Sequence, residues 1–187
     1  VSPLIVCLSE TKLAVVNASI VSNTLGPLFD CFFLLPTSGT RGGILMAWRS
    51  CDISLSHPDI GAYHVSALAT PLIDGQQHWW VTAIYGPQEE DAKVAFLAEL
   101  HDFCLTCAGP WIVGGDFNMI LSSTEKNNGR LHHRTMSRFR RFVADLELWD
   151  IYLHGRRFTW SNEQHDPTLV CNDRVLCTPS WEDCQPN

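Results

Sequence analysis

The hydrophobic pattern of this chain changes its period at Glu89, and that change restricts the fold more than any other feature. Upstream of Glu89, short apolar runs alternate with turn residues, which is the pattern of short strands. Downstream, apolar residues recur at helical spacing until Gly109 and Pro110 end the segment. Because strands come in blocks with helical segments between them, we predict an α/β sandwich, with two sheets and helices outside, rather than a doubly wound parallel sheet.

The strand-type runs differ in length and in the turns that separate them. The first run, residues 4–8, is continuously apolar, as in a strand that is covered on both faces. Asp74 and Gly75 predict a hairpin connection, and Asp166 with Pro167 predicts a turn between two last short strands, residues 156–162 and 172–177. Further strands are predicted within residues 31–43, 42–50, 52–57, 62–70, 78–87 and 110–121.

Two segments carry the pattern of amphipathic helices. Glu89, Glu90 and Asp91 lie in or before the first turn of the first helix, where its dipole favours acidic residues. Its apolar face is predicted to hold Phe96, Leu97, Leu100, Phe103 and Cys104. A polar loop, residues 122–135, precedes the second helix, whose apolar face is predicted to hold Phe139, Phe142, Val143, Leu146 and Trp149.

Length and composition limit the number of domains, the partners and the compartment that can be expected. A chain of 187 residues predicts one domain. The net charge of −7 argues against general adhesion to polyanions. It does not argue against a nucleic-acid substrate, because a bound divalent cation reverses the sign of the local charge. No signal peptide or membrane-spanning run is found, so an intracellular protein without a membrane partner is expected. The eight cysteines are expected to be reduced, mostly buried thiols. Since the chain starts at Val1 on a strand, it reads as a piece of a longer protein.

The stretch PWIVGGDFNMIL, residues 110–121, permits two interpretations. If the backbone stays extended, Asp116 and Asn118 point to one face while Phe117 points to the other. A carboxylate beside a carboxamide suits a hard cation or a water that needs orienting. Gly114 and Gly115 then leave room for a close approach to the backbone. The alternative is an ordinary turn, because glycine, aspartate and asparagine are turn formers.

Polar residues follow other strand-type runs as well. Glu10 ends the first run, Tyr85 ends the run before the first helix, and Asp173 begins the last run. With Asp116 and Asn118, they are predicted to converge on one rim of the sandwich. Such a set is suited to metal-assisted hydrolysis, in which Glu10 holds a cation, Asp116 accepts a proton from water, and Asn118 and Tyr85 donate to a phosphate oxygen.

The segments LSETKL, AIYGP, GGDFN, FTWSN and DRVL, in this order, resemble the endonuclease/exonuclease/phosphatase superfamily. The nearest resemblance is to the endonuclease domain of plant LINE-type (non-LTR) retrotransposons. It implies a DNase I-like four-layered sandwich, with two mixed, mostly antiparallel sheets flanked by helices. It also implies hydrolysis of a DNA phosphodiester with Mg²⁺ or Mn²⁺, in a domain that is covalently continuous with a reverse transcriptase.

The resemblance assigns roles to individual residues. It makes Glu10 the Mg²⁺ ligand and Tyr85 the phenol that contacts the scissile phosphate. Asp116 would orient or deprotonate the attacking water, and Asn118 would bind the phosphate. Thr159 helps to frame the site, and Asp173 matches the aspartate that orients a catalytic histidine.

The sequence also departs from the family pattern. In the family pattern, a first strand bears a metal-site asparagine and a last strand bears Ser-Asp-His, and this chain starts after the one and stops before the other. Residues 1–187 are therefore expected to form an incomplete domain, with impaired catalysis and a weakly bound cation. Asn172 replaces an apolar residue before Asp173. The alternatives are a non-catalytic remnant of a retroelement, or a phosphatase or phosphodiesterase that acts on a small molecule or lipid.

A cluster of basic residues precedes and enters the second helix. Two interpretations stand: the cluster tracks a DNA backbone, or it is a solvated polar face. Asp173 likewise has the simpler alternative of pairing with the neighbouring Arg174. The residues expected to contact DNA are Arg130, Arg134, Arg138 and Arg141.

Overall fold

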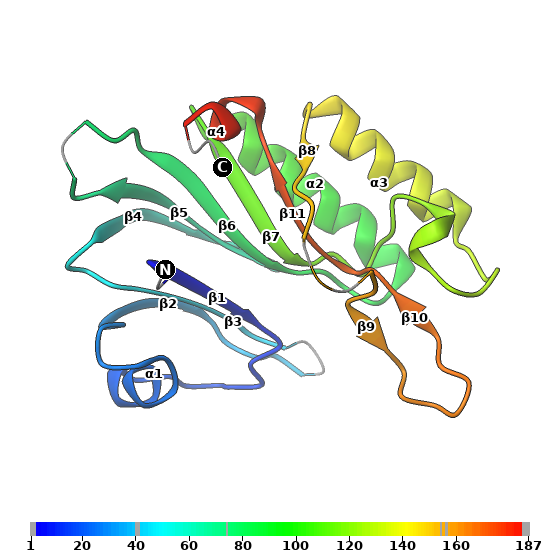
Figure 1. The fold of residues 1–187 in the computed structure, drawn as a ribbon, viewed down its shortest axis with the longest axis horizontal. Coiled ribbons are helices and arrows are strands. Elements are labelled where there is room, and N and C mark those ends of the chain that lie inside the picture. The colour runs from blue at the N-terminus through cyan, green and yellow to red at the C-terminus, as the bar shows by residue number, and fades with distance from the viewer. Residues whose placement is uncertain (1–2, 40–41, 74, 154, 156, 185–187) are drawn as a thin grey trace.

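The computed structural model describes residues 3–39, 42–73, 75–153, 155 and 157–184. Two sheets lie face to face, with helices on their outer sides (Figure 1). The predicted α/β sandwich is therefore confirmed. A small hairpin extends from it on one side.

The strands and helices have the following bounds. The strands are β1 (Ile5–Ser9), β2 (Cys31–Leu35), β3 (Ile44–Trp48), β4 (Ile53–Ile60), β5 (His64–Pro71), β6 (Trp79–Tyr85), β7 (Trp111–Asp116), β8 (Trp149–Asp150), β9 (Trp160–Ser161), β10 (Leu169–Val170) and β11 (Asp173–Cys177). The helices are α1 (Ala18–Leu25), α2 (Glu90–Thr106), α3 (His133–Asp145) and α4 (Pro179–Cys184), with a 3-10 turn at Ser123–Glu125.

The larger sheet has the order β4-β5-β6-β7-β11-β8. Strands β4, β5 and β6 form a meander, and the predicted hairpin connection lies between Pro71 and Trp79. Asp74 falls outside the described residues. β6 and β7 are parallel and are joined through α2, whereas the other neighbours are antiparallel. The carboxyl ends of β6 and β7 consequently meet at the same edge of the sheet.

The smaller sheet is antiparallel, with the order β1-β3-β2. Helix α1 covers its outer face, with Val21 buried among side chains of β3. The sequence did not predict α1, although its start carries a capping signal: the Asn17 side chain accepts a hydrogen bond from the Ile20 N–H at 2.9 Å. With only eight residues, α1 shows too few turns for its apolar period to stand out.

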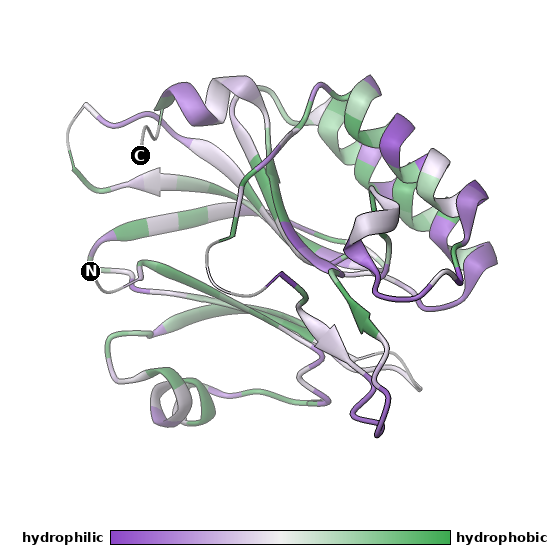
Figure 2. Ribbon diagram, turned by 45° about the vertical axis from the view of Figure 1, so that its right-hand side comes forward, coloured by the Kyte–Doolittle hydropathy of each residue, from purple (hydrophilic) through white to green (hydrophobic). Residues whose placement is uncertain are grey.

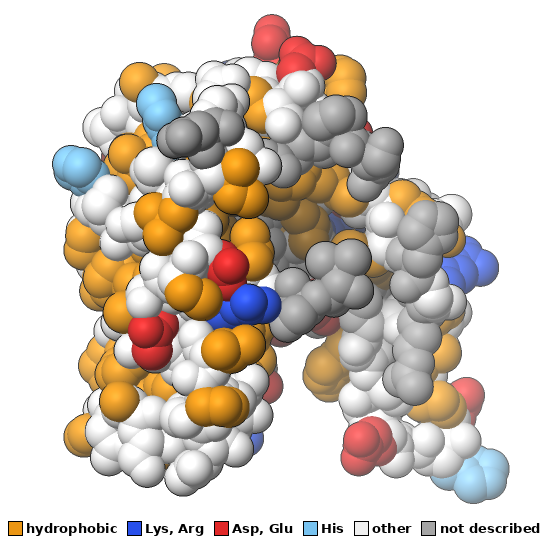
Figure 3. All heavy atoms as spheres, turned by 60° about the vertical axis from the view of Figure 1, so that its left-hand side comes forward, with side chains coloured by type: hydrophobic (Ala, Val, Ile, Leu, Met, Phe, Trp, Pro, Cys, Tyr) orange, Lys and Arg blue, Asp and Glu red, His pale blue; other side chains and the backbone are white. Residues whose placement is uncertain are grey.

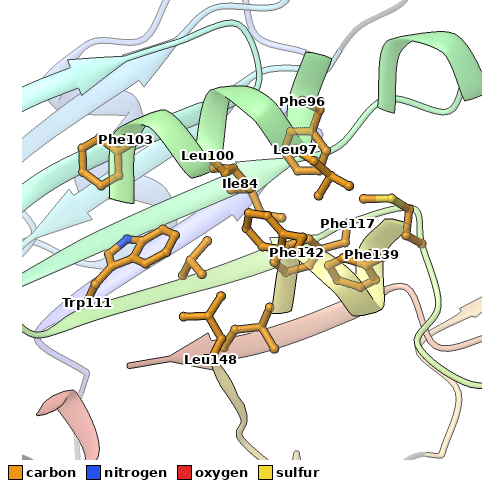
Figure 4. Close-up of a cluster of buried hydrophobic side chains, with 13 residues drawn as sticks. Ile84, Phe96, Leu97, Leu100, Phe103, Trp111, Phe117, Phe139, Phe142 and Leu148 are labelled. Atoms are coloured by element: carbon orange, nitrogen blue, oxygen red, sulfur yellow. The ribbon is translucent and has the colours of Figure 1, made fainter. Parts of the chain in front are cut away.

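Apolar side chains fill the spaces between the layers. The space between the two sheets is filled by residues such as Met46, Ile53 and Val65. Helices α2 and α3 pack on the other face of the large sheet, where aromatic rings from both helices meet those of β7 and Phe117 (Figure 4). Colouring by hydropathy shows the polar and apolar sides of α3 (Figure 2). The predicted faces Phe96, Leu97, Leu100, Phe103 and Cys104, and Phe139, Phe142, Val143 and Leu146, are confirmed.

Three predicted boundaries were wrong. Trp149 does not continue the face of α3, because the helix ends at Asp145 and Trp149 begins β8 with its side chain exposed. α3 begins at His133, inside the segment predicted as a loop. The turn at Asp166–Pro167 connects β9 to β10, not to β11, and β11 instead lies between β7 and β8.

All eight cysteines are free thiols, but only Cys177 is buried, so the expectation that most of them are buried was wrong. Within the described part of the chain, no helix has the length and apolar character that crossing a membrane requires. The space-filling view shows acidic, basic and apolar side chains interspersed over one face, which is hollowed between two parts of the molecule (Figure 3).

Candidate functional site

The end of β7 is a turn that presents polar side chains. The strand stops at Asp116, and Asn118 adopts a left-handed conformation with φ of 51°. The Asn118 N–H donates to Asp116 Oδ1 at 2.7 Å, while Phe117 is fully buried against Phe139. The extended backbone expected through Asn118 is therefore wrong. The turn nevertheless places both polar side chains in one cavity and Phe117 in the core, so the two interpretations of this stretch are compatible.

Glycine is required at the end of β7 by the neighbouring strand. Gly115 has φ of 140°, and a Cβ at this position would lie 2.3 Å from the Ile84 carbonyl oxygen of β6. The two glycines were expected to leave room for a close approach to the backbone. At Gly115, the segment that approaches is the neighbouring strand β6. Any larger residue at 115 would displace the end of β7 from β6.

Three candidate residues lie side by side across the large sheet. Tyr85 of β6 is in register with Asp116 of β7, and Asp116 is in register with Asp173 of β11. Paired residues of neighbouring strands project to the same face. The register therefore brings two carboxyl groups and one phenol together at one edge of the sheet.

Glu10 reaches this edge from the other sheet. It follows β1 with φ of 55°, and its carboxylate lies close enough to the Tyr85 hydroxyl to add to burial in raising the pKa of the phenol. A Cβ on Gly42 would lie 2.7 Å from the Glu10 Cα and 3.1 Å from the Tyr85 Cε1, so the absence of a side chain there lets the two residues meet. Lys12 Nζ lies 3.7 Å from Glu10 Oε1 on the exposed side.

A cavity of about 390 Å³ holds four of the residues predicted for catalysis and metal binding, namely Glu10, Tyr85, Asp116 and Asn118. Its other walls come from the start of α2, the start of α3, the loop after β7 and the β9–β10 hairpin. The Asn118 Nδ2 donates to the Gly86 carbonyl oxygen at 2.8 Å, which leaves its second N–H available to a ligand.

Burial and crowding of acids shift two pKa values in the cavity. Burial, together with the Asp173 and Glu10 carboxylates, raises the pKa of Asp116 to about 6, against the opposing hydrogen bond from the Asn118 N–H. Burial also raises the pKa of Tyr85, and the negative charges of Glu10 and Asp116 add to the effect. Asp116 consequently exchanges its proton close to neutral pH, whereas the Tyr85 hydroxyl keeps its own.

Asp173 and Thr159 line an adjacent cavity of about 490 Å³. The Thr159 Oγ1 accepts hydrogen bonds from the N–H groups of Asn172 and Asp173, each at 3.0 Å, and so fixes the start of β11. Asn172 points to the first cavity, where its Nδ2 lies 3.5 Å from Asn118 Oδ1. The suggested pairing of Asp173 with Arg174 is wrong, because Arg174 lies on the opposite face and pairs with Glu125 and Asp150.

The four basic candidates divide into two groups. Arg130 lines the first cavity. Arg134, Arg138 and Arg141 lie on the exposed side of α3, and Arg141 pairs with Asp145 at 3.2 Å.

The sequence did not single out several residues that line the cavity. Lys93 and Glu90 reach it from the first turn of α2, and Lys126 reaches it from the loop after β7. Lys93 could have been suspected as a cavity residue only from its position shortly after Tyr85, at the start of a helix whose other charged residues are acidic. Composition and period alone do not separate it from a surface lysine.

The donor set suits a cation that keeps much of its water. In the described ranges, no group of three or more His, Cys, Asp or Glu side chains is positioned to hold a metal ion. Glu10 and Asp116 are nonetheless close enough for their charges to interact, and Mg²⁺ typically needs only one or two carboxylates alongside water and phosphate oxygens. The residues present therefore fit a weakly held, hydrated ion.

Comparison with known proteins places this geometry in context. A model of the endonuclease/exonuclease/phosphatase family matches residues 1–186, while no curated protein sequence matches the chain. Among solved structures, the endonuclease domain of TRAS1, a telomere-specific non-LTR retrotransposon, is similar with a TM-score of 0.67 and 14% identity, covering 97% of this chain and 88% of that one.

Two further structures illustrate the range of similar proteins. The human Nocturnin catalytic domain with bound sulfate has a TM-score of 0.59 and 16% identity, covering 95% of this chain and 70% of its own. TDP2 of D. rerio, complexed with a single-strand DNA product, has a TM-score of 0.57 and 13% identity, covering 98% and 74%. These likenesses confirm the DNase I-like fold.

Proposed function

Because the chain belongs to the endonuclease/exonuclease/phosphatase family, we propose that the cavity at Asp116 hydrolyses phosphodiester bonds in DNA. The observation that carries the proposal is the meeting of Glu10, Tyr85, Asp116 and Asn118 in one cavity, with the pKa of Asp116 raised to about 6. A base is most effective when its pKa lies near the working pH.

Asp116 would accept the proton of the attacking water. Its Oδ1 is held by the Asn118 N–H, so the carboxylate has a fixed orientation. Its second oxygen accepts no hydrogen bond from the described residues and can contact water. Nearby acids and burial raise its proton affinity, which makes it a stronger base than an exposed aspartate. Asp173 contributes to this effect through its charge, across the β7–β11 pair.

Asn118 and Tyr85 would hold the phosphate. The free N–H of the Asn118 carboxamide and the Tyr85 hydroxyl are both hydrogen-bond donors in the cavity, and donors that are already oriented stabilise the charge that builds on phosphate oxygens. Burial and the negative charge of Glu10 raise the pKa of Tyr85, so the phenol keeps the proton that it would donate.

A divalent cation would be held by Glu10, with Asp116 nearby. When bound, Mg²⁺ or Mn²⁺ neutralises phosphate oxygens and the leaving group. The incomplete donor set predicts that the ion is held weakly without substrate.

DNA is favoured over a small phosphate ester by two features. Basic residues lie beside the cavity and along α3, where they offer further contacts to a polymer. The TRAS1 endonuclease domain is similar over nearly the whole of its length. We infer that the chain derives from a retrotransposon endonuclease whose parent protein also carries a reverse transcriptase.

A plasmid-nicking assay tests the proposal. Supercoiled plasmid is incubated with the chain in Mg²⁺, in Mn²⁺ and in EDTA, and the open-circular form is quantified. Because the chain is expected to be an incomplete domain with impaired catalysis, slow nicking is expected in either metal and none in EDTA, and it should be lost in Glu10→Gln and Asp116→Asn. Arg49→Gln, at the opposite end of β3 from the cavity, is the matched control. Nicking that survives in both site variants would refute the assignment, as would the absence of metal-dependent nicking by the wild-type chain.

A further inference from the structure

Lys93 is a buried lysine on the wall of the cavity. Its side chain is only 11% exposed, and its Nζ donates to Glu90 Oε1 at 2.6 Å. The other oxygen of Glu90 accepts a hydrogen bond from the Thr135 hydroxyl of α3. Lys93 is thus held in place by a bridge between two helices, and it lines the same cavity as Asp116 and Asn118.

The position of Lys93 is unfavourable for stability. A cation in the first turn of a helix opposes the helix dipole, and burying a charge costs free energy unless it is fully paired. Burial acts to raise the pKa of Glu90, but hydrogen bonds from Lys93 and Thr135 outweigh it, so that the pKa is lowered and Glu90 stays ionised. One ionised partner therefore compensates part of the cost of burying Lys93.

The ammonium group of Lys93 can donate further hydrogen bonds. It carries three N–H donors, and within the described part of the chain Glu90 is its one hydrogen-bond acceptor. Its charge also reaches Asp116, whose pKa it acts to lower. Lys126, Arg130 and His132 line the same cavity, so the walls formed by the starts of α2 and α3 and by the loop after β7 carry an excess of basic side chains.

We propose that Lys93 forms a second phosphate subsite, which binds an oxygen of the phosphate next along the strand to the one held by Asn118 and Tyr85. The inference rests on the proposed function and deepens it, because it names the substrate class as a chain with at least two consecutive phosphates. The acidic side of the cavity serves the reacting phosphate, and the basic side serves its neighbour. Glu90 and Thr135 are positioning residues that keep the Lys93 ammonium turned toward the cavity.

Two substitutions distinguish this subsite from a purely structural ion pair. Lys93→Gln removes the positive charge and should weaken DNA binding. Glu90→Gln removes the neighbouring negative charge but keeps a side-chain oxygen that can accept from Lys93, and should strengthen DNA binding. If the pair only stabilises the contact between α2 and α3, both variants should disturb the cavity and weaken binding together.

The measurement is fluorescence anisotropy of a labelled duplex oligonucleotide in EDTA, over a range of NaCl concentrations. Each phosphate contact adds about 0.9 to the slope of log affinity against log salt. Lys93→Gln should lower that slope by about 0.9 and reduce the affinity at 0.1 M NaCl by roughly 5–10-fold. Glu90→Gln should bind more tightly than the wild type, and Arg49→Gln should bind as the wild type does.

The outcomes separate this proposal from the proposed function. If the wild-type chain nicks plasmid but Lys93→Gln keeps the wild-type slope, the second subsite is overturned and the hydrolytic function stands. Weaker binding in both variants, with urea unfolding showing both to be destabilised, also overturns it in favour of a structural ion pair. If the wild-type chain binds no duplex at any salt concentration, both proposals fail.

Discussion

The two faces of β11 treat charge in opposite ways. Asp173 points to the edge where Asp116 lies in register beside it, so two carboxyl groups meet across neighbouring strands. The next residue, Arg174, points to the other face, is 4% exposed, and pairs with both Glu125 and Asp150. One face of the strand thus brings like charges together, and the other neutralises two carboxylates with one guanidinium. We call the face that carries Asp173 beside Asp116 the repulsive face, and the face that carries Arg174 the neutralised face.

This difference separates a region built for chemistry from a region built for stability. Burial raises the pKa of Asp150, but the charge and hydrogen bond of Arg174 oppose the shift. At Asp116, burial and two neighbouring acids act in the same direction, and among the residues that the structure describes the only opposing side-chain charge is that of Lys93. Perturbed acids of this kind gather at functional sites, where repulsion is maintained at a cost to stability.

The largest expected effect is on catalysis by the repulsive face. Asp116→Asn keeps the size of the side chain but cannot accept the proton of water, so the nicking rate should fall by a factor of roughly 10²–10⁴. In the wild type, the rate should rise with pH up to about 6 and then level as Asp116 ionises. Initial rates between pH 4.5 and 8 check this. A variant that keeps both the rate and the rise would show that another group is the base.

The next effect is on the stability of the neutralised face. Arg174→Met should lower the free energy of unfolding by about 3 kcal/mol, because it leaves two carboxylates partly buried without a cation. The value lies at the low end of the usual range because Asp150 is 40% exposed. Urea unfolding at pH 7 measures it.

A triple variant sharpens this prediction. Arg174→Met combined with Glu125→Leu and Asp150→Leu removes all three charges, and replacement of a buried ionic cluster by apolar residues is often neutral or stabilising. The triple variant should therefore be more stable than the single one. If it is less stable, the interaction with Arg174 is not the reason for the loss.

The sequence predicted the repulsive face better than the neutralised one. Asp116 and Asp173 stand in short motifs at strand ends, and their placement follows once the strands are paired. Arg174 finds partners 24 and 49 residues away, in β8 and in the 3-10 turn, and no local pattern reports such contacts. The same limit explains why Lys93 and Glu90 were not anticipated as cavity residues.

The fold shows a similar division. Long apolar runs such as those of β3 and β6, and the seventeen-residue helix α2, were predicted because their periods are repeated several times. Helix α1 and strand β10 were missed, because eight and two residues give too little of any period. The turn that ends β7 at Asp116 depends on a side-chain hydrogen bond, which the pattern of apolar residues does not encode.

A third prediction concerns Asp116→Asn again, whose stability should rise although its activity falls. In the folded chain the pKa of Asp116 is raised from its usual 3.8 to about 6, so the folded state binds more protons than the unfolded state between those values. Stability is therefore lost as pH rises from about 4 to about 6, and the loss is complete above that range. Asp116→Asn does not ionise and should be more stable than the wild type at pH 7.5.

The size of that gain has an upper limit. A pKa raised from 3.8 to about 6 corresponds to roughly 3 kcal/mol, and partial exposure of the carboxyl group reduces the expected gain to about 1–2 kcal/mol. Urea unfolding of both proteins at pH 4 and pH 7.5 tests the sign. A gain that is equal at the two pH values would mean that the ionisation of Asp116 is not its cause.

The smallest effect is expected at an exposed arginine, which serves as the counterpart of Arg174. Arg141 pairs with Asp145 one turn away on α3, but its side chain is 82% exposed, and such pairs contribute about 0.3–0.5 kcal/mol. Arg141→Gln should therefore change the free energy of unfolding by less than about 0.5 kcal/mol. If the exposed side of α3 contacts DNA, the same variant should still lower the slope of log affinity against log salt by about 0.9. An unchanged slope would mean that this side of α3 is a solvated polar surface, and would confine the DNA contacts to the cavity and its rim.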